Sequence, residues 1–161
     1  MLIRNLTLHK VMFEFPSELR HACRSGSFAS PTSGQCRGYV QANLCILPAE
    51  YAFDFLLFCQ RNPKPCPLLH VLENGIYQLG DIDIRCDLPR YRIYVDGVLT
   101  REVEDISDIW RDNDWVTFLI GCSFSFEDAL ELAGLKIRHI ELNKNVPMYV
   151  FIMNCYWIPV V

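Results

Sequence analysis

The chain has 161 residues, of which 51% are apolar, and this length fits one domain, or two small lobes that share a core. Its formal net charge is −4, so no general field attracts nucleic acid or an anionic membrane surface, both of which favour basic patches. No apolar run reaches the roughly 18 residues needed to span a bilayer. The sequence therefore predicts a compact protein that has neither nucleic acid nor a membrane as partner.

The first residues of the chain give a weak signal about its compartment. They include Arg4, His9 and Lys10 and no acidic residue before Glu14, which is compatible with a mitochondrial transit peptide. Transit peptides are usually richer in serine and arginine, and a frayed or strand-forming N-terminus explains the segment equally well. We expect an intracellular soluble protein, in the cytoplasm or in the mitochondrial matrix.

Eight cysteines are spread along the chain, and several of them lie inside apolar runs. Because the chain lacks a secretory h-region, this distribution favours reduced thiols over disulfides. No pair has CxxC spacing, and the closest pair, Cys59 and Cys66, does not suit a zinc knuckle. The sequence therefore predicts no metal site.

The first predicted element is a short helix that Pro16 opens and Ser25-Gly26 closes. A loop with turn-forming residues over 30–34 follows it, and residues 39–47 are predicted to form a buried strand.

A second helix starts at Pro48 and stops at Asn62-Pro63. Its aromatic and aliphatic residues fall at helical spacing in a wide stripe, which predicts that the helix is buried on most sides. Residues 68–72 are predicted to form a strand.

Residues 90–95 alternate between polar and apolar side chains, and Asp96-Gly97 predicts a hairpin turn into residues 98–99. The apolar residues 116–120 fit either a strand or a helix. Between these elements lies an acidic stretch, which is most simply a solvated face: Glu102, Glu104, Asp105 and Asp108.

The last predicted helix has Ser125 as its N-cap, Glu127 and Asp128 in its first turn, and Gly134 at its end. Strands and helices therefore alternate along the chain, which favours a mixed α/β (α+β) domain built as a layered sheet with flanking helices. One face of the last helix is predicted to be its apolar side: Phe126, Ala129, Leu130 and Ala133.

Five stretches of the sequence carry polar residues in or beside apolar runs, in a fixed order: 38–48, 54–64, 87–92, 121–127 and 138–141. Together they closely resemble the D-glutamate cyclase family, whose bacterial members are often labelled "putative hydro-lyase". The resemblance is carried by these stretches rather than by composition or periodicity.

The resemblance covers residues 14–149, which we interpret as the N-terminal part of a D-glutamate cyclase-like domain. Residues 150–161 are apolar and depart from the family pattern, so we interpret them as a divergent tail on a truncated or alternatively spliced product. The loop over 73–85 is shorter than the corresponding family loop, and any substrate contact made there is in question.

The resemblance implies a lyase that converts D-glutamate to 5-oxo-D-proline and water, with no organic cofactor or metal. Such a site needs a cationic clamp for the α-carboxylate, a proton donor and acceptor, and hydrogen-bond donors for the developing oxyanion. Two alternatives stay open. One is a hydro-lyase acting on another small carboxylic acid, and the other is a catalytically inactive fragment that acts by binding, with a homo-oligomer as one form of association.

The catalytic candidates are Cys122, Ser123 and Ser125, which lead into a helix N-terminus that favours an anion, and His139, which offers acid–base chemistry. In the alternative interpretation Ser125 only caps the helix, Cys122 packs in the core and His139 is a satisfied structural histidine. Residues 32–34 form at most a substrate-facing turn, because the glycine-lysine signature of a P-loop is absent.

The substrate-binding candidates are arginines that can clamp a carboxylate and amides that can orient it. Arg24 and Arg61 follow apolar helices next to polar loops, and Arg138 precedes the candidate histidine. Gln41 and Asn43 lie two apart on a predicted strand, so they share a face, where they either orient the substrate or satisfy loop backbone groups. If Arg61 belongs to the clamp, its replacement by alanine should raise the Michaelis constant strongly.

Overall fold

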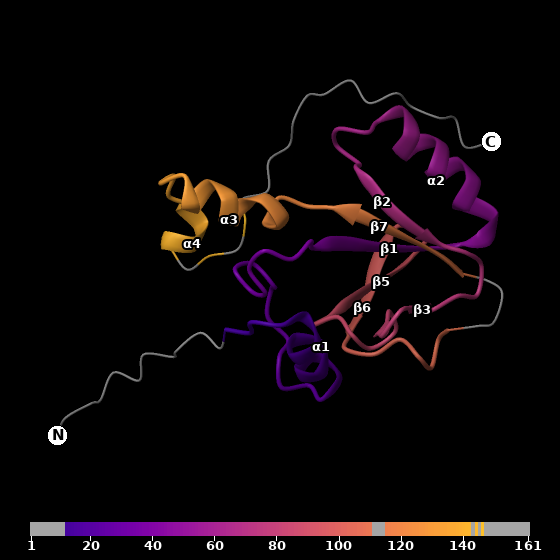
Figure 1. Ribbon diagram of the computed structural model, residues 1–161. Coiled ribbons are helices and arrows are strands. Elements are labelled where there is room, and N and C mark those ends of the chain that lie inside the picture. Colours follow the sequence, from indigo (N-terminus) through magenta and orange to yellow (C-terminus); the bar gives the residue numbers. More distant parts are fainter. Residues whose placement is uncertain (1–11, 111–114, 143, 145, 147–161) are drawn as a thin grey trace.

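The protein is seen in a computed structural model that describes residues 12–110, 115–142, 144 and 146 (Figure 1). The predicted tail over 150–161 lies outside these described residues. The elements in chain order are α1 (Pro16–Arg24), β1 (Ala42–Pro48), α2 (Ala49–Arg61), β2 (Leu68–Leu72), β3 (Gln78–Leu79), β4 (Ile82–Asp83), β5 (Tyr91–Val95), β6 (Val98–Val103), β7 (Trp115–Gly121), α3 (Phe124–Leu132) and α4 (Arg138–Glu141). This mixture of helices and small antiparallel sheets confirms the predicted α+β class.

The main sheet has three strands in the order β1-β7-β2, and both neighbours run antiparallel to β7. Ala42 pairs with Gly121 at one end of β1, and Pro48 pairs with Trp115 at the other. The sequence left 116–120 open between strand and helix, and the structure makes this stretch the central strand. Its backbone groups are satisfied by pairing with a strand on each side. The periodicity of the local sequence does not reveal this pairing.

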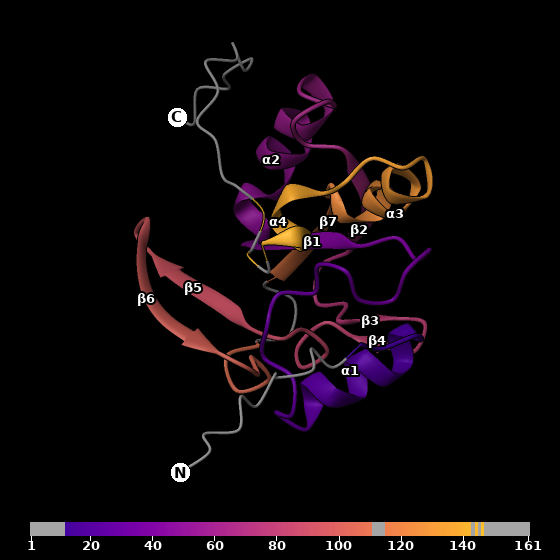
Figure 2. The same cartoon turned by 90° about the vertical axis from the view of Figure 1, so that its left-hand side faces the viewer.

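Helix α2 covers one face of this sheet, while α1 and the short β-structures lie on the other side (Figures 1 and 2). The Phe55 ring meets the Phe118 ring edge-on, with centroids 4.9 Å apart. The expected burial of α2 on most sides is wrong, because Cys59 is its only buried residue and Phe53 is 72% exposed. A three-stranded sheet covers one side of the helix and leaves the other to solvent.

Strand β1 starts at Ala42 rather than at residue 39, and its residues are half-buried or exposed rather than buried. As an edge strand it has only β7 as a hydrogen-bonded neighbour. The predicted strand at 68–72 is confirmed as β2.

The predicted hairpin is confirmed as β5 and β6, and it projects from the body of the molecule (Figure 2). Asp96 and Gly97 both have positive φ, 50° and 74°, as a tight primed hairpin turn requires. The four acidic residues over 102–108 are exposed, which confirms the predicted solvated face.

Helix α3 begins two residues earlier than expected, with Ser123 rather than Ser125 at its N-cap. Its predicted apolar side is wrong as well, because Phe126 is 55% exposed whereas Glu127 is only 6% exposed. The loop that precedes β1 packs against the polar side of the helix and covers it. Gly134 ends the helix as predicted, with a φ of 82° and with the Leu135 N–H donating to the Leu130 carbonyl.

No helix in the described part of the chain is long and apolar enough to cross a membrane. Seven of the eight cysteines lie in this part, and all seven are free thiols: Cys23, Cys36, Cys45, Cys59, Cys66, Cys86 and Cys122.

Candidate active site

A loop over residues 31–41 carries one wall of the candidate site, and its backbone is unusual. Gly34, Cys36 and Gly38 all have positive φ, and at Cys36, with a φ of 47°, the side chain makes this conformation costly by about 1 kcal/mol or more. The Cys36 N–H donates to the Phe13 carbonyl at 2.9 Å, and Cys36 is buried. Contacts outside the loop therefore hold it in a shape that its own residues do not prefer.

The loop is fastened to the first turns of α3. The Gly38 N–H donates to Asp128 Oδ2 at 2.7 Å, and the Gln41 N–H donates to Ser125 Oγ at 2.9 Å. A charged acceptor makes the first of these bonds a strong one. Segments far apart in sequence are thereby brought together at the start of α3.

Gln41 is the centre of this junction. Its Oε1 accepts from Thr32 Oγ1 at 2.7 Å, and its Nε2 donates to the Gln35 carbonyl at 3.0 Å. Its own carbonyl accepts from Ser125 Oγ at 3.1 Å and from Cys122 Sγ at 3.5 Å. The amide thus satisfies loop groups, which is one of the two interpretations that the sequence left open.

Behind this junction lies a cluster of Ser33, Ser123, Glu127 and His139, which we call the acid–base cluster. Ser123 Oγ donates to Glu127 Oε1 at 3.2 Å, and His139 Nε2 lies 3.2 Å from Glu127 Oε2 and 3.4 Å from Ser33 Oγ. The side chains of Glu127 and His139 are 7% and 10% exposed. Three separate segments therefore place a carboxylate, an imidazole and two hydroxyls in one buried spot.

The carboxylate of this cluster is only partly satisfied. Glu127 Oε2 is buried and accepts no hydrogen bond within the described residues, and the nearest charged group to it is the His139 imidazole, whose Nε2 lies 3.2 Å away. No lysine or arginine of the described residues forms an ion pair with Glu127. A carboxylate beside an imidazole and hydroxyls is an arrangement that can accept, hold and return a proton.

Of the nine residues that the sequence singled out, five meet around this cluster. They are Gln41, Cys122, Ser123, Ser125 and His139.

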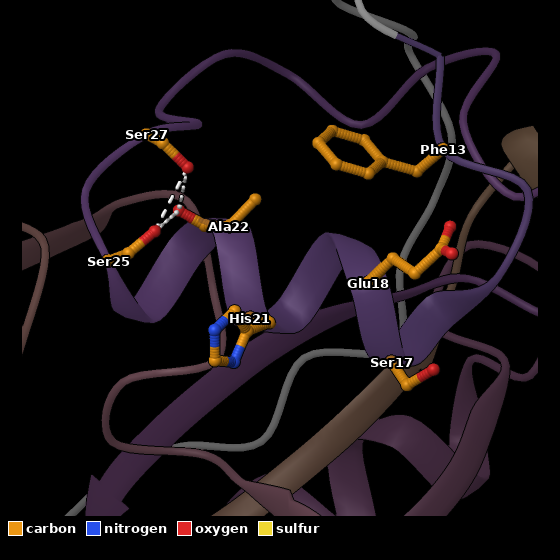
Figure 3. A pocket seen from close by; sticks show the side chains of 7 residues that line it. All are labelled: Phe13, Ser17, Glu18, His21, Ala22, Ser25 and Ser27. Carbon is orange, nitrogen blue, oxygen red and sulfur yellow. Dashed lines mark hydrogen bonds between the residues drawn. The ribbon is translucent and has the colours of Figure 1, made fainter.

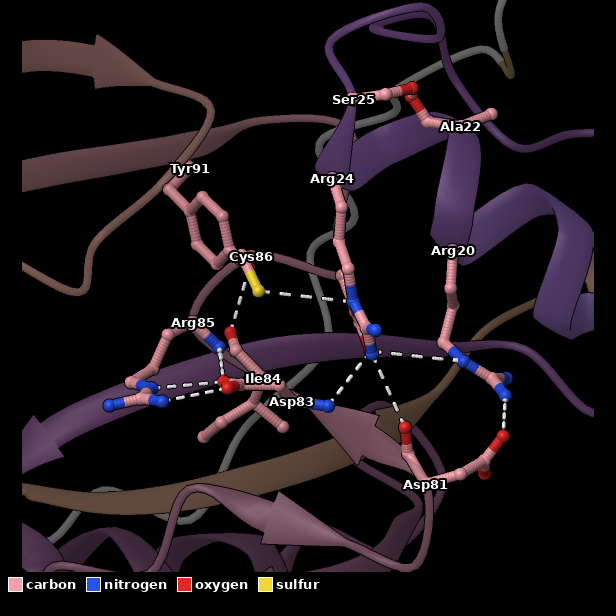
Figure 4. Close-up of polar contacts among 11 residues, drawn as sticks. Arg20, Ala22, Arg24, Ser25, Asp81, Asp83, Ile84, Arg85, Cys86 and Tyr91 are labelled. Atoms are coloured by element: carbon pink, nitrogen blue, oxygen red, sulfur yellow. Dashed lines mark hydrogen bonds and ion pairs between the residues drawn. The ribbon is translucent and has the colours of Figure 1, made fainter.

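Arg24 lies elsewhere, at the end of α1, where it forms a bidentate pair with Asp87. It also donates to the Asp81 carbonyl (Figure 4). The hydrogen bonds to Asp87 raise the pKa of the Arg24 guanidinium, and the Asp87 side chain is fully buried. Arg20 pairs with the exposed Asp81 beside it. In this structure Arg24 ties α1 to the loop that follows β4.

The other three candidates are exposed and stand outside the cluster. Arg61 ends α2, and Asn43 lies on β1 opposite Ile120. The Arg138 side chain is 77% exposed and lies 3.4 Å from Glu141 Oε2. Their roles in substrate binding stay predictions.

Three residues near the cluster were not among the site candidates predicted from the sequence: Ser33, Arg37 and Glu127. Arg37 lies in the 31–41 loop and donates to Glu131 Oε2 of α3 at 2.8 Å, so this arginine links the loop to the helix. Glu127 lies four residues after Ser123, which places both on one helix face, and this spacing was a usable signal. No local pattern predicts that Ser33 meets His139 across more than a hundred residues.

Two surface hollows lie away from the cluster. The hollow along α1 has no lysine or arginine in its lining, and its Ser25 and Ser27 hydroxyls donate to the Ala22 carbonyl (Figure 3). A second hollow has Arg24 in its lining with Asp81 and Asp83 beside it. Neither offers a free cation for a dicarboxylate. The hollow along α1 is lined by Phe13, Ser17, Glu18, His21, Ala22, Ser25 and Ser27.

Among the described residues, no group of three or more histidine, cysteine or acidic side chains could hold a metal ion. Burial raises the pKa of the Cys45 and Cys59 thiols, which also lie near Cys66, so these thiols are held in their protonated form at neutral pH.

Several known proteins similar to this chain come from bacteria. A protein of Clostridium beijerinckii named "putative hydro-lyase" is 55% identical over 144 residues, which cover 87% of this chain and 55% of that protein. Proteins of the same description from Burkholderia ambifaria and Oceanobacillus iheyensis are each 57% identical, and the matches cover 83% of this chain and 53% and 54% of those proteins. The chain thus spans about half the length of these relatives, and their bacterial origin gives the mitochondrial prediction no support.

The D-glutamate cyclase family model matches residues 116–160. This range contains Ser123, Glu127 and His139 and continues past residue 149, where the sequence analysis placed the start of a divergent tail. The chain is therefore a homologue of the proteins named "putative hydro-lyase" and is related to the D-glutamate cyclase family, as the resemblance predicted.

Proposed function

We propose that this chain carries the site of a carbon–oxygen hydro-lyase that converts D-glutamate to 5-oxo-D-proline and water. The observation that carries the proposal is the buried pair of Glu127 and His139, 3.2 Å apart, inside the range that matches the D-glutamate cyclase family. The pair supplies the proton acceptor and donor that this reaction requires.

The cyclisation moves two protons from nitrogen to oxygen. The amine nitrogen attacks the γ-carboxyl carbon, a C–N bond forms and a C–O bond breaks. The ammonium nitrogen loses two protons in total, and the leaving carboxylate oxygen gains both and departs as water. His139 is proposed to take each proton from the nitrogen and to deliver it toward the oxygen, with Glu127 stabilising the imidazolium.

The developing oxyanion needs hydrogen-bond donors, and the start of α3 is proposed to provide them. Backbone N–H groups of the first helical turn lack intrahelical partners, and the Ser123 hydroxyl lies at the same end. Cys122 and Ser125 are proposed to shape this end through their bonds to the Gln41 carbonyl. The α-carboxylate is proposed to meet an arginine near the cluster, with Arg37 and Arg138 in the nearest segments.

A binding role for an inactive chain has an observation of its own. Leu132 is 91% exposed, and Phe126 and Leu135 are 55% and 57% exposed, so α3 and the loop after it present an apolar surface. Analytical ultracentrifugation tests this alternative, because a monomer at all protein concentrations argues against self-association through that surface.

The test of the proposed reaction is proton NMR of the purified chain with D-glutamate, with L-glutamate in a parallel sample. We expect resonances of 5-oxoproline to grow only with the D-enantiomer. Dispersed methyl signals, with no product from D-glutamate, would exclude the reaction for this chain. Product from another carboxylic acid in a substrate panel would instead support a different hydro-lyase.

A further inference from the structure

We propose that Asp96 is a site of spontaneous covalent modification in the folded protein. Its side-chain carboxyl and the backbone nitrogen of Gly97 close to a succinimide, which water opens to isoaspartate. The inference is independent of the acid–base cluster. It starts from a pattern that the sequence contains twice, an asparagine or aspartate followed by glycine, at Asn74-Gly75 and at Asp96-Gly97.

The reaction needs no reagent other than water. The Gly97 nitrogen attacks Cγ of Asp96, a C–N bond forms and a C–O bond breaks. The carboxyl oxygen leaves as water with the amide proton and one proton from solution. Water then adds to the α-carbonyl carbon of the succinimide and breaks its bond to nitrogen, which regains a proton. The chain then continues through the β-carboxyl, and the α-carboxylate is free.

Glycine in the second position permits this attack, because no side chain crowds its nitrogen. Both pairs have this glycine, and both Asn74 and Asp96 are exposed. In an unfolded chain both residues can therefore form a succinimide. The folded structure distinguishes them by the hydrogen bonding of the two glycine nitrogens.

The nitrogen that follows Asn74 is held by a hydrogen bond. The Gly75 N–H donates to the carbonyl of Trp115, at the start of β7, at 3.0 Å. Around the same turn the Ile76 N–H donates to the carbonyl of the exposed Glu73, also at 3.0 Å. The Gly75 nitrogen can attack only after its own bond is broken and its proton removed, so this loop must open first. The fold therefore shields Asn74.

The nitrogen that follows Asp96 has no such bond. Within the described part of the chain, the Gly97 N–H donates no hydrogen bond. The turn lies between the paired residues Val95 and Val98, and β5 and β6 form a two-stranded sheet of their own, which projects from the body (Figure 2). Two-stranded sheets are only marginally stable. The Asp96-Gly97 peptide can thus turn toward the carboxyl when the tip alone opens.

The modification would change the hairpin itself. Asp96 and Gly97 have φ values of 50° and 74°, and a two-residue turn of this shape sets the register of its strands. Isoaspartate adds a methylene to the backbone of the turn. We expect the pairing of Val95 with Val98 to be lost, which faster hydrogen exchange at the tip would report.

The test incubates the full chain in heavy-oxygen water, once folded and once unfolded in guanidinium chloride. Peptide mass spectrometry follows the label, because each succinimide takes an oxygen from the solvent when it opens. The ratio of the unfolded to the folded rate at one site cancels the different reactivities of amide and carboxyl. We expect this ratio to be at least about tenfold larger at Asn74 than at Asp96, because only Asn74 needs the loop bonds to break.

Two variants assign the signal at residue 96. Asp96→Glu would have to close a larger ring, so we expect it to lose the label there while Asn74 labels as before. Asp96→Asn keeps a turn sequence that favours this hairpin and should label faster, because an amide carbon is more electrophilic than a carboxylate carbon. Equal ratios at the two sites, label at Asn74 but not at residue 96 in the folded chain, or label retained in Asp96→Glu would each overturn the inference.

Discussion

Two buried carboxylates of this protein have opposite surroundings. Asp87 is fully buried and is held by Arg24 in a bidentate pair, by Arg20 at 3.8 Å and by the Asp83 N–H at 2.8 Å. Glu127 is nearly as buried, but its neighbours are a serine hydroxyl and an imidazole.

We infer from this difference that Asp87 is a structural group and that Glu127 is a functional one. Arginines and a backbone donor satisfy both oxygens of Asp87, which links α1 to the loop over 83–87 and leaves nothing for a ligand to add. Glu127 Oε2, by contrast, has only the His139 imidazole beside it, at 3.2 Å. By burial alone the two carboxylates look alike, and only the hydrogen-bond and ion-pair partners of each oxygen distinguish them.

The largest effect is expected for Asp87→Asn, which leaves Arg24 without its partner. Breaking a buried, hydrogen-bonded pair should lower the free energy of unfolding by about 3 kcal/mol, somewhat below the full range for such pairs because Arg24 is 42% exposed. Urea titration measures this change. The control Asp81→Asn removes an ion pair whose acid is 76% exposed and should cost less than about 1 kcal/mol; equal losses in the two variants would contradict the distinction.

The same titration on Glu127→Gln should give the opposite result. The amide can keep the hydrogen bond from Ser123, and the substitution removes a buried charge that has no lysine or arginine partner within the described residues, so the free energy of unfolding should change by less than about 1 kcal/mol or rise. A loss as large as that of Asp87→Asn would mean that Glu127 is a structural group.

A smaller effect is expected for Gln41→Ala, which removes the amide that bonds to Thr32 and Gln35 within the 31–41 loop. Loss of its two side-chain hydrogen bonds should lower the free energy of unfolding by about 1 to 2 kcal/mol. Hydrogen exchange should accelerate in the loop and at the start of α3, and Gln60→Ala at the exposed end of α2 is the control. Unchanged exchange in the loop would show that Gln41 does not hold it.

The smallest effect concerns pH. A hydrogen bond from Arg85 lowers the pKa of Asp83, so the stability that Asp83 contributes is present above its unfolded pKa of about 3.9 and is lost as pH falls toward the lower folded value. The difference in unfolding free energy between the wild-type chain and Asp83→Asn should shrink by a few tenths to about 1 kcal/mol between about pH 5 and pH 3. A difference that stays constant over this interval would contradict the assignment.

Local signals predicted those elements whose boundaries depend on nearby residues. Pro16 marked the start of α1, Asp96-Gly97 marked the hairpin turn, and Gly134 marked the end of α3, because each favours a backbone shape independently of distant contacts. The apolar face of α3 was misjudged, since burial is decided by what packs against a helix, and the loop over 31–41 covers its polar side.

The candidate site was predicted in part for the same reason. Ser123 and Ser125 lie at a helix start and His139 lies in a motif, so the sequence could nominate them. The meeting of Ser33 with His139 depends on a loop whose shape distant contacts impose, so no sequence spacing encodes it. The arginine candidates were chosen without knowledge of their partners, and Arg24 is the example in which the partner is Asp87.

The most direct measurement of the central claim is the rate of 5-oxoproline formation from D-glutamate by Glu127→Gln, beside Glu73→Gln and the wild-type chain, by proton NMR. We expect the rate to fall by about 10² to 10⁴ in Glu127→Gln with dispersed methyl signals retained, and to stay at the wild-type value in Glu73→Gln. A folded Glu127→Gln variant that forms product at the wild-type rate would contradict the assignment of the acid–base cluster as the active site.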